Sequence, residues 1–173
     1  CRDRLRRQVA ARRLYRAAGA GAYVPAPQSS RSRPAVARPR QHGLAPDNVA
    51  GIVVKLPTDA IGIVGGSAMP DVNCQHLVAL ALQKGAVSFS DSHDAALMKD
   101  PAVLAIRQKV RVVGDPALMD PAAPRGAIVE VTLTDGSRFE RHTRFPPGTK
   151  ENALSTEQVT AKVRDLMAPV LGA

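Results

Sequence analysis

The chain has 173 residues, of which 45% are hydrophobic, and its formal net charge is +9 at pH 7. Residues 1–40 contain eleven arginines, no lysine and one acid, whereas residues 41–173 contain thirteen basic and fourteen acidic residues. A basic balance argues for polyanionic partners only where the charge is concentrated in space. The composition therefore excludes a basic nucleic-acid-binding domain over the larger part of the chain. It separates a positive N-terminal arm from a nearly neutral remainder.

Residues 1–42 are predicted to form an arginine-rich arm of low order, because their prolines and serines follow no helical or strand period. Clustered arginines can bind nucleic acid by releasing counterions, but this arm carries only Tyr15 and Tyr23 for stacking on bases. We therefore do not expect nucleic acid to be a partner. The remainder is long enough for one domain, which we place at 43–150, followed by a C-terminal amphipathic helix at 151–173.

The domain is expected to begin with a strand and a helix. A β-branched run at 52–54 ends before Pro57, which predicts the strand. Apolar residues then recur at helical spacing over 74–82, with Asp71 as the expected N-cap and Gly85 as the expected C-cap.

Further elements are expected in chain order. They are a helical region at 91–99, a helix from Pro101 to Gln108, a strand at 109–113, a strand at 127–133 and a returning strand at 137–143. The Asp135-Gly136 pair supplies the turn chemistry of a β-hairpin between the last two strands. Segregated helices and a hairpin-containing antiparallel sheet predict an α+β fold rather than a doubly wound parallel one.

The chain ends in an amphipathic helix. Ser155 and Gln158 have the spacing of a capping box. One face of the following helix is apolar and consists of Val159, Val163, Leu166, Met167 and Val170. The stripe should either fold back on the domain or drive self-association of the chain. We expect self-association, because the domain needs its own helices to cover its sheet.

Few residues are candidates for chemistry. His93 precedes Asp94, a carboxylate that could fix its tautomer, although Asp94 could equally cap a helix. His76 lies beside the apolar stripe of its helix, where a structural histidine is the commoner outcome, and Cys74 suits a small core residue. Lys55 is expected to face solvent on an edge strand. Neither paired cysteines nor histidines at i, i+4 occur, so we expect no metal site.

Five colinear segments carry a resemblance to a known family. They are GIVVKLPTDAIGIV, MPDVNCQHLVALALQKGAVSFSDSHD, DPAVLAIRQKVRVVGDPAL, AIVEVTLTDGSRFERHTRFPPGTKENALS and VTAKVRDLMAPVLG. In order and spacing this run resembles the C-terminal third of the MmgE/PrpD family, which contains 2-methylcitrate dehydratase. Those enzymes combine a large helical domain with a smaller α+β lid, and they dehydrate, decarboxylate or epimerise small di- and tricarboxylates without a metal or organic cofactor.

The resemblance implies a lid from Asn48 to about Phe145. Neither the apolar run of a signal peptide nor a stretch approaching the roughly 18 apolar residues of a membrane span occurs, so we expect a cytoplasmic protein. The resemblance also implies that the catalytic groups come mainly from the helical domain, so we expect this chain to be a C-terminal fragment that is inactive alone. Asn73, His76 and His93 are the candidates for contact with a small carboxylate substrate. Two alternatives remain open at this point: a stand-alone α+β binding or dimerisation module, and a basic-armed protein associated with nucleic acid.

Overall fold

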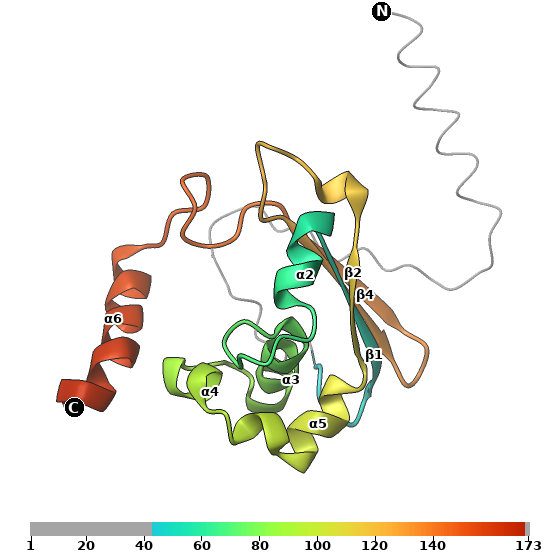
Figure 1. Ribbon diagram of the computed structural model, residues 1–173, viewed down its shortest axis with the longest axis horizontal. Helices are drawn as coiled ribbons and strands as arrows, with labels where there is room; N and C mark the ends of the chain where they lie inside the picture. Colours follow the sequence, from blue (N-terminus) through green and yellow to red (C-terminus); the bar gives the residue numbers. More distant parts are fainter. Residues whose placement is uncertain (1–42, 172–173) are drawn as a thin grey trace, which may run out of the picture.

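Four strands form one mixed sheet in the computed structural model, which describes residues 43–171 (Figure 1). The strands are β1 (Val49–Leu56), β2 (Val110–Gly114), β3 (Ala127–Leu133) and β4 (Arg138–Thr143). The helices are α2 (Ile61–Val64), α3 (Cys74–Lys84), α4 (Phe89–His93), α5 (Pro101–Arg107) and α6 (Thr156–Leu171), and short 3-10 turns cover Thr58–Ala60, Leu97–Lys99 and Pro116–Leu118. The predicted α+β class is confirmed. The predicted arm at 1–42 lies outside the described residues.

The strand order is β2-β1-β3-β4, so β1 lies inside the sheet. β1 pairs antiparallel with β3 and parallel with β2, and the parallel pair makes the sheet mixed. β3 and β4 form the predicted hairpin, in which Gly136 has a φ of +85°. Only glycine adopts such a φ without steric cost, and this explains why the Asp-Gly pair marks the turn.

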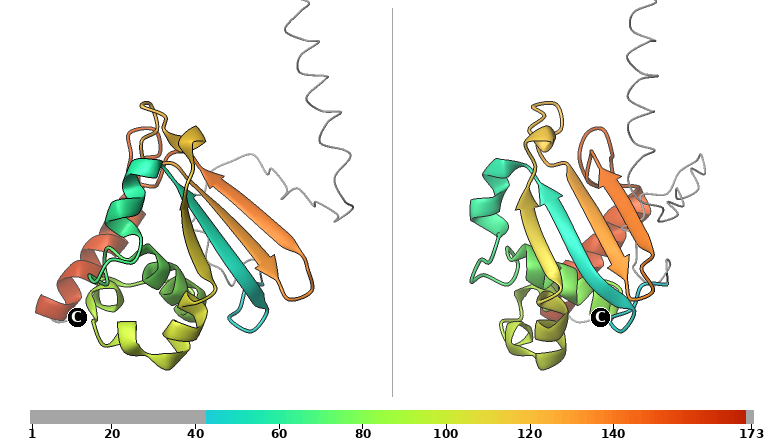
Figure 2. Two further views of the ribbon diagram at one scale, coloured as in Figure 1. Left: turned by 45° about the vertical axis from the view of Figure 1, so that its right-hand side comes forward. Right: turned by 90° about the vertical axis from the view of Figure 1, so that its right-hand side faces the viewer.

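One face of the sheet packs against α3 and α5 (Figure 2). The core joins alternate residues of the strands to one side of each helix: Val49, Ile52, Val54, Val110 and Val131 from the sheet, Ala79, Leu80 and Leu82 from α3, and Val103 and Ile106 from α5. Because side chains of a strand alternate between faces, Val53 and Lys55 of β1 point away from this core. The crossover from β1 to β2 supplies the helices that cover the sheet.

Asn73 caps α3, and the prediction that Asp71 does so is wrong. The Asn73 Oδ1 atom accepts a hydrogen bond from the backbone N–H of His76 at 2.9 Å. Gly85 ends the helix as predicted, in a left-handed conformation with a φ of +82°. Asp71 and Asn73 both lie within three residues of the start of α3, and Asn73 is the one that caps it. The Asp71 carboxylate is therefore available for a tertiary contact.

The helical region predicted at 91–99 is two short pieces. α4 begins after Ser88 and ends at His93, and a separate 3-10 turn covers Leu97–Lys99. Asp94 separates them, with its Oδ1 atom accepting from the Ala96 N–H at 2.8 Å. A side chain that bonds its own backbone two residues ahead competes with a helix, so the chain turns here.

The outer face of the sheet is polar. Lys55 forms an ion pair with Glu130, and the pKa of Lys55 is raised mainly by this hydrogen bond. Glu130 stands directly opposite Glu140 of β4, so the lysine also lies close to a second carboxylate. The prediction that Lys55 lies on an edge strand is wrong, because β1 is an inner strand and Lys55 forms its ion pair with Glu130 of the neighbouring strand β3.

α6 begins with the predicted capping box: the Ser155 N–H donates to Gln158 Oε1 at 2.8 Å, and the Gln158 N–H donates to Ser155 Oγ at 3.3 Å. In Figure 1 the helix lies to one side of the sheet and of α3 and α4. Within residues 43–171, no helix has the length and apolar character that crossing a bilayer requires.

Candidate functional site

An open apolar groove of about 560 Å³ lies between α2 and α3. Its walls come from the end of β1, from α2, from the loop before α3 and from one face of α3: Leu56, Val64, Asp71, Val72, Cys74, Leu77, Val78 and Ala81. Asp71 is the charged residue of this lining. A mostly apolar concavity with a single polar group at one place has the general character of a ligand site.

The loop 65–73 forms one side of the groove and is fixed by hydrogen bonds from α3. Gln75 Oε1 accepts from the Gly66 N–H at 3.0 Å, and the Asn73 side-chain amide donates to the Ser67 carbonyl. The Asn73 N–H in turn donates to the Met69 carbonyl at 3.0 Å. These contacts place Asp71 on the groove wall.

His93 does not line the groove but lies beside Asp71, which does. Its Nε2 atom lies 3.8 Å from Asp71 Oδ2, and its ring is 48% exposed. Its Nδ1 atom lies 2.9 Å from the Phe89 carbonyl oxygen and 3.0 Å from the Ser92 Oγ atom, which itself donates to the same carbonyl. These contacts orient the ring so that its Nε2 edge faces the Asp71 carboxylate.

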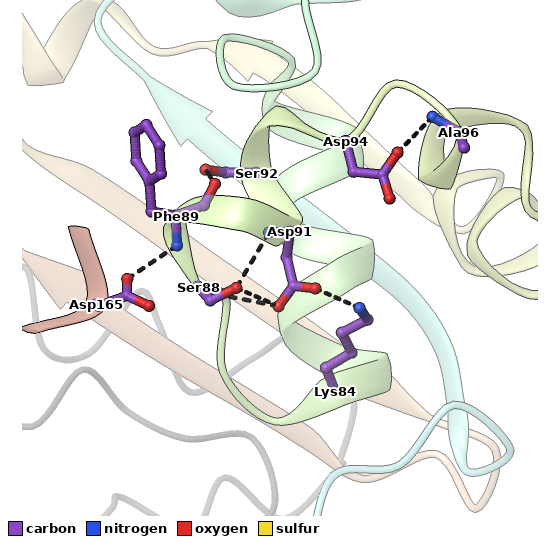
Figure 3. Close-up of polar contacts among 8 residues, drawn as sticks. All are labelled: Lys84, Ser88, Phe89, Asp91, Ser92, Asp94, Ala96 and Asp165. Carbon is purple, nitrogen blue, oxygen red and sulfur yellow. Dashed lines mark hydrogen bonds and ion pairs between the residues drawn. The ribbon is translucent and has the colours of Figure 1, made fainter. Parts of the chain in front are cut away.

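α4 is anchored by a cluster of charges (Figure 3). Ser88 and Asp91 form a complete capping box, and Asp91 also forms an ion pair with Lys84 of α3. The Lys84 hydrogen bond is the main reason that the pKa of Asp91 is lowered. Asp165 of α6 reaches the same end of α4, where its Oδ2 atom accepts from the Phe89 N–H at 2.9 Å. The helix that carries His93 is thus held from two directions.

Sequence reasoning paired His93 with the wrong carboxylate. Asp94, its neighbour in the chain, bonds the backbone of Ala96, whereas Asp71, twenty-two positions earlier, lies beside the ring. No local sequence pattern predicts the Asp71–His93 contact, because it depends on how α4 packs beside the loop 65–73.

The other two candidates, Asn73 and His76, are not among the residues that line the groove. The Asn73 and His76 side chains are both 0% exposed. Asn73 is used as a cap, and neither ring nitrogen of His76 has a hydrogen-bond partner among the described residues. Burial, together with the nearby positive charge of Arg107, lowers the pKa of His76. Their contact with a ligand remains a prediction.

Cys74 does line the groove, and burial raises the pKa of its thiol. A raised pKa disfavours the thiolate, which is the reactive form, so the side chain serves as part of the apolar wall. Within the described residues, no group of three or more His, Cys, Asp or Glu side chains could hold a metal ion.

Comparison with known proteins gives one family. The model of the MmgE/PrpD C-terminal domain matches residues 35–173, about four fifths of the chain. A search of curated proteins finds no significant match. The matched range contains the whole described fold, from the strand β1 to the helix α6. The chain therefore belongs to the MmgE/PrpD family, and the part that establishes this is its C-terminal domain.

Proposed function

We propose that this chain provides the lid portion of a lyase-type enzyme that acts on small di- or tricarboxylates, such as 2-methylcitrate, and that it needs a helical domain for turnover. The observation that carries the proposal is the family match over residues 35–173. The groove with Asp71 and His93 is the surface that would close over the substrate.

The chemistry of His93 supports a role in proton transfer. Removing a proton next to a carboxylate needs a positioned base in the right protonation state. In this proposal Nδ1 of His93 donates to the Phe89 carbonyl at 2.9 Å, and Nε2 is the atom that accepts the substrate proton. The Asp71 carboxylate lies 3.8 Å from the same Nε2 atom. In this proposal His93 is the proton acceptor of the lid, and its Nδ1 contacts with Phe89 and Ser92 orient the ring.

The charge of the groove supports the requirement for a second domain. A di- or tricarboxylate carries negative charges, and the enolate-like state that follows proton removal adds another, so the site needs cations. The charged residue of the groove lining is an acid, Asp71. The cationic half of the pocket must then come from a surface that packs against the groove, which is the role of the helical domain in this proposal.

The test is to assay the full chain with 2-methylcitrate and cis-aconitate, alone and with a separately produced helical domain of a family enzyme. We expect no turnover from the chain alone and turnover in the mixture. His93→Gln should lower kcat of the mixture by about 10²- to 10⁴-fold. The matched control is His142→Gln, because His142 is exposed on β4, and it should leave kcat unchanged. Turnover by the chain alone that depends on His93 or Lys55 would place the active site entirely in the lid and overturn the proposal.

The alternative is a stand-alone binding or dimerisation module, and the open apolar groove is the observation that favours it. Such a module would bind an apolar ligand between α2 and α3 without chemistry. The same assay separates the two: a module gives no turnover in the mixture, and its ligand binding does not depend on His93.

A further inference from the structure

α4, the helix that carries His93, has little apolar packing of its own. It has five residues, none of them buried, and it has no extended packing with any other helix or strand within residues 43–171. A helix this short is not stable by itself in water, because too few hydrogen bonds offset the cost of forming its first turn. Polar contacts with neighbouring elements must therefore determine where α4 lies.

The Asp91 carboxylate collects the polar contacts at the start of α4 (Figure 3). Its Oδ1 atom is bound by the Lys84 ammonium, and its Oδ2 atom accepts from the Ser88 N–H at 3.2 Å and from Ser88 Oγ at 2.8 Å. Ser88 belongs to the cap of α4 itself, whereas Lys84 is the last residue of α3. The ion pair between Lys84 and Asp91 therefore joins α4 to the last turn of α3.

The other end of α3 holds Asp71. The cap of α3 and hydrogen bonds from its first turn fix the loop 65–73, which carries Asp71. A regular α-helix rises about 1.5 Å per residue, so the eleven residues of α3 set a fixed distance between its two ends. The two members of the 3.8 Å contact, Asp71 and His93, are thus attached to opposite ends of one helix.

The imidazole of His93 follows any movement of α4. Its Nδ1 atom lies 2.9 Å from the Phe89 carbonyl oxygen and 3.0 Å from Ser92 Oγ, and the centroids of the His93 and Phe89 rings are 4.0 Å apart. Phe89 and Ser92 both belong to α4, so a displacement of this helix carries the ring with it. A misplacement of about 1 Å at a reacting group is enough to slow a reaction.

We propose that Lys84 is a positioning residue for His93, and that it acts through Asp91 and α4 to hold the imidazole beside Asp71. The importance of this placement for turnover rests on the proposed function, whereas the placement itself does not. Lys84 is not among the residues that line the groove, so its effect passes through His93 and not through a contact with a ligand there.

The size of the effect follows from the exposure of the ion pair. The Lys84 and Asp91 side chains are 38% and 24% exposed, and a partly exposed pair of this kind shifts an equilibrium by about two- to fivefold. Asp165 still accepts from the Phe89 N–H when Lys84 is replaced. We therefore expect a partial loss of the placement of His93 and not a complete one.

Nuclear magnetic resonance of the full chain tests the placement without any turnover. The measurement is the strength of the Overhauser contacts between the ring protons of His93 and the protons of Asp71. Lys84→Met removes the charge and keeps a long unbranched side chain, and it should weaken these contacts about two- to fivefold. Lys84→Arg keeps a cation and should preserve them. Lys99→Met is the matched control, because Lys99 is exposed in the 3-10 turn Leu97–Lys99, and it should leave them unchanged.

Kinetics of the mixture with the helical domain test the consequence for turnover. Lys84→Met should lower kcat about two- to fivefold and change KM by less than about twofold, and Lys84→Arg should retain the kcat of the natural chain. Circular dichroism confirms that the variants fold.

The proposal would be overturned by contacts that keep their full strength in Lys84→Met, by an equal loss in Lys99→Met, or by a Lys84→Arg variant that loses them as Lys84→Met does. Weakened contacts with an unchanged kcat would overturn its catalytic part. If the natural chain gives no turnover in the mixture while the resonance results are as expected, the proposed function fails and the placement of His93 by Lys84 stands.

Discussion

Replacing His76 by phenylalanine should stabilise the protein, although His76 is one of its most buried residues. The ring is 0% exposed, and both of its nitrogens lack a partner among the described residues. Leaving a buried polar group unpaired costs about 1–3 kcal/mol. Phenylalanine has a ring of similar shape without polar atoms, and the slight excess of volume costs up to about 1 kcal/mol. We expect His76→Phe to raise the free energy of unfolding by about 1–2 kcal/mol at pH 7.5.

The effect should grow in acid, and its sign follows from the direction of the pKa shift. Burial and Arg107 lower the pKa of His76 in the folded state, whereas the unfolded value is about 6.5. The stability that depends on a neutral ring is therefore complete above about pH 6.5 and is lost as the pH falls below it, by at most about 1.4 kcal/mol per pH unit. The phenylalanine variant has no such loss, so the gap between the two proteins should widen from pH 7.5 to pH 5.5.

Urea unfolding followed by circular dichroism at both pH values measures these differences. Leu80→Ala serves as a control that the core governs the transition, because Leu80 is 0% exposed and its truncation should cost about 2–5 kcal/mol. The reasoning would be refuted by a His76→Phe variant that is less stable at pH 7.5 and keeps the pH dependence of the natural chain. That result would mean that a water or another group already bonds the ring.

Two further predictions concern local structure. Asp91→Asn should lower the free energy of unfolding by about 1 kcal/mol, because it weakens both the capping box with Ser88 and the ion pair with Lys84. The pKa of Asp91 is lowered in the folded state, so its contribution to stability is present near neutral pH and is lost as the pH falls through the folded-state pKa. Urea unfolding should therefore show a smaller difference between the two proteins near pH 3 than at pH 7. Gly136→Ala should lower the free energy of unfolding by about 1–2 kcal/mol, because Gly136 has a φ of +85°. Gly62→Ala in α2 is the control and should be neutral or slightly stabilising, because no atom lies within contact distance of the added methyl group. Equal effects of the two substitutions would contradict the turn assignment.

The elements that the sequence predicted best are those that local chemistry determines. The hairpin follows from the Asp135-Gly136 pair, the end of α3 from Gly85, and the start of α6 from the Ser155 and Gln158 capping box. Each signal lies within a few residues of the structure that it specifies. The α+β class then followed from the order of strands and helices.

What sequence reasoning missed depends on residues far apart in the chain. The parallel pairing of β1 with β2 joins Ile52 to Val110, and no short pattern encodes it. The same holds for the contact between Asp71 and His93, on which the candidate site rests. The burial of His76 could be anticipated from its helical stripe, but the lack of a partner for its ring could not, because it depends on every element packed around α3.

The position of β4 at the end of the sheet bears on how copies of this chain can meet. An open strand edge exposes unpaired backbone groups and can template further pairing between chains, which leads to aggregation. β4 reads RFERHT, and Arg138, Glu140 and Arg141 place charges along this edge on both faces of the strand. In several antiparallel registers a second β4 laid alongside would bring two arginines or two glutamates opposite each other, and like charges directly opposite each other are destabilising. The charges on β4 thus disfavour those pairings at this edge, as charged side chains on edge strands do in other sheets.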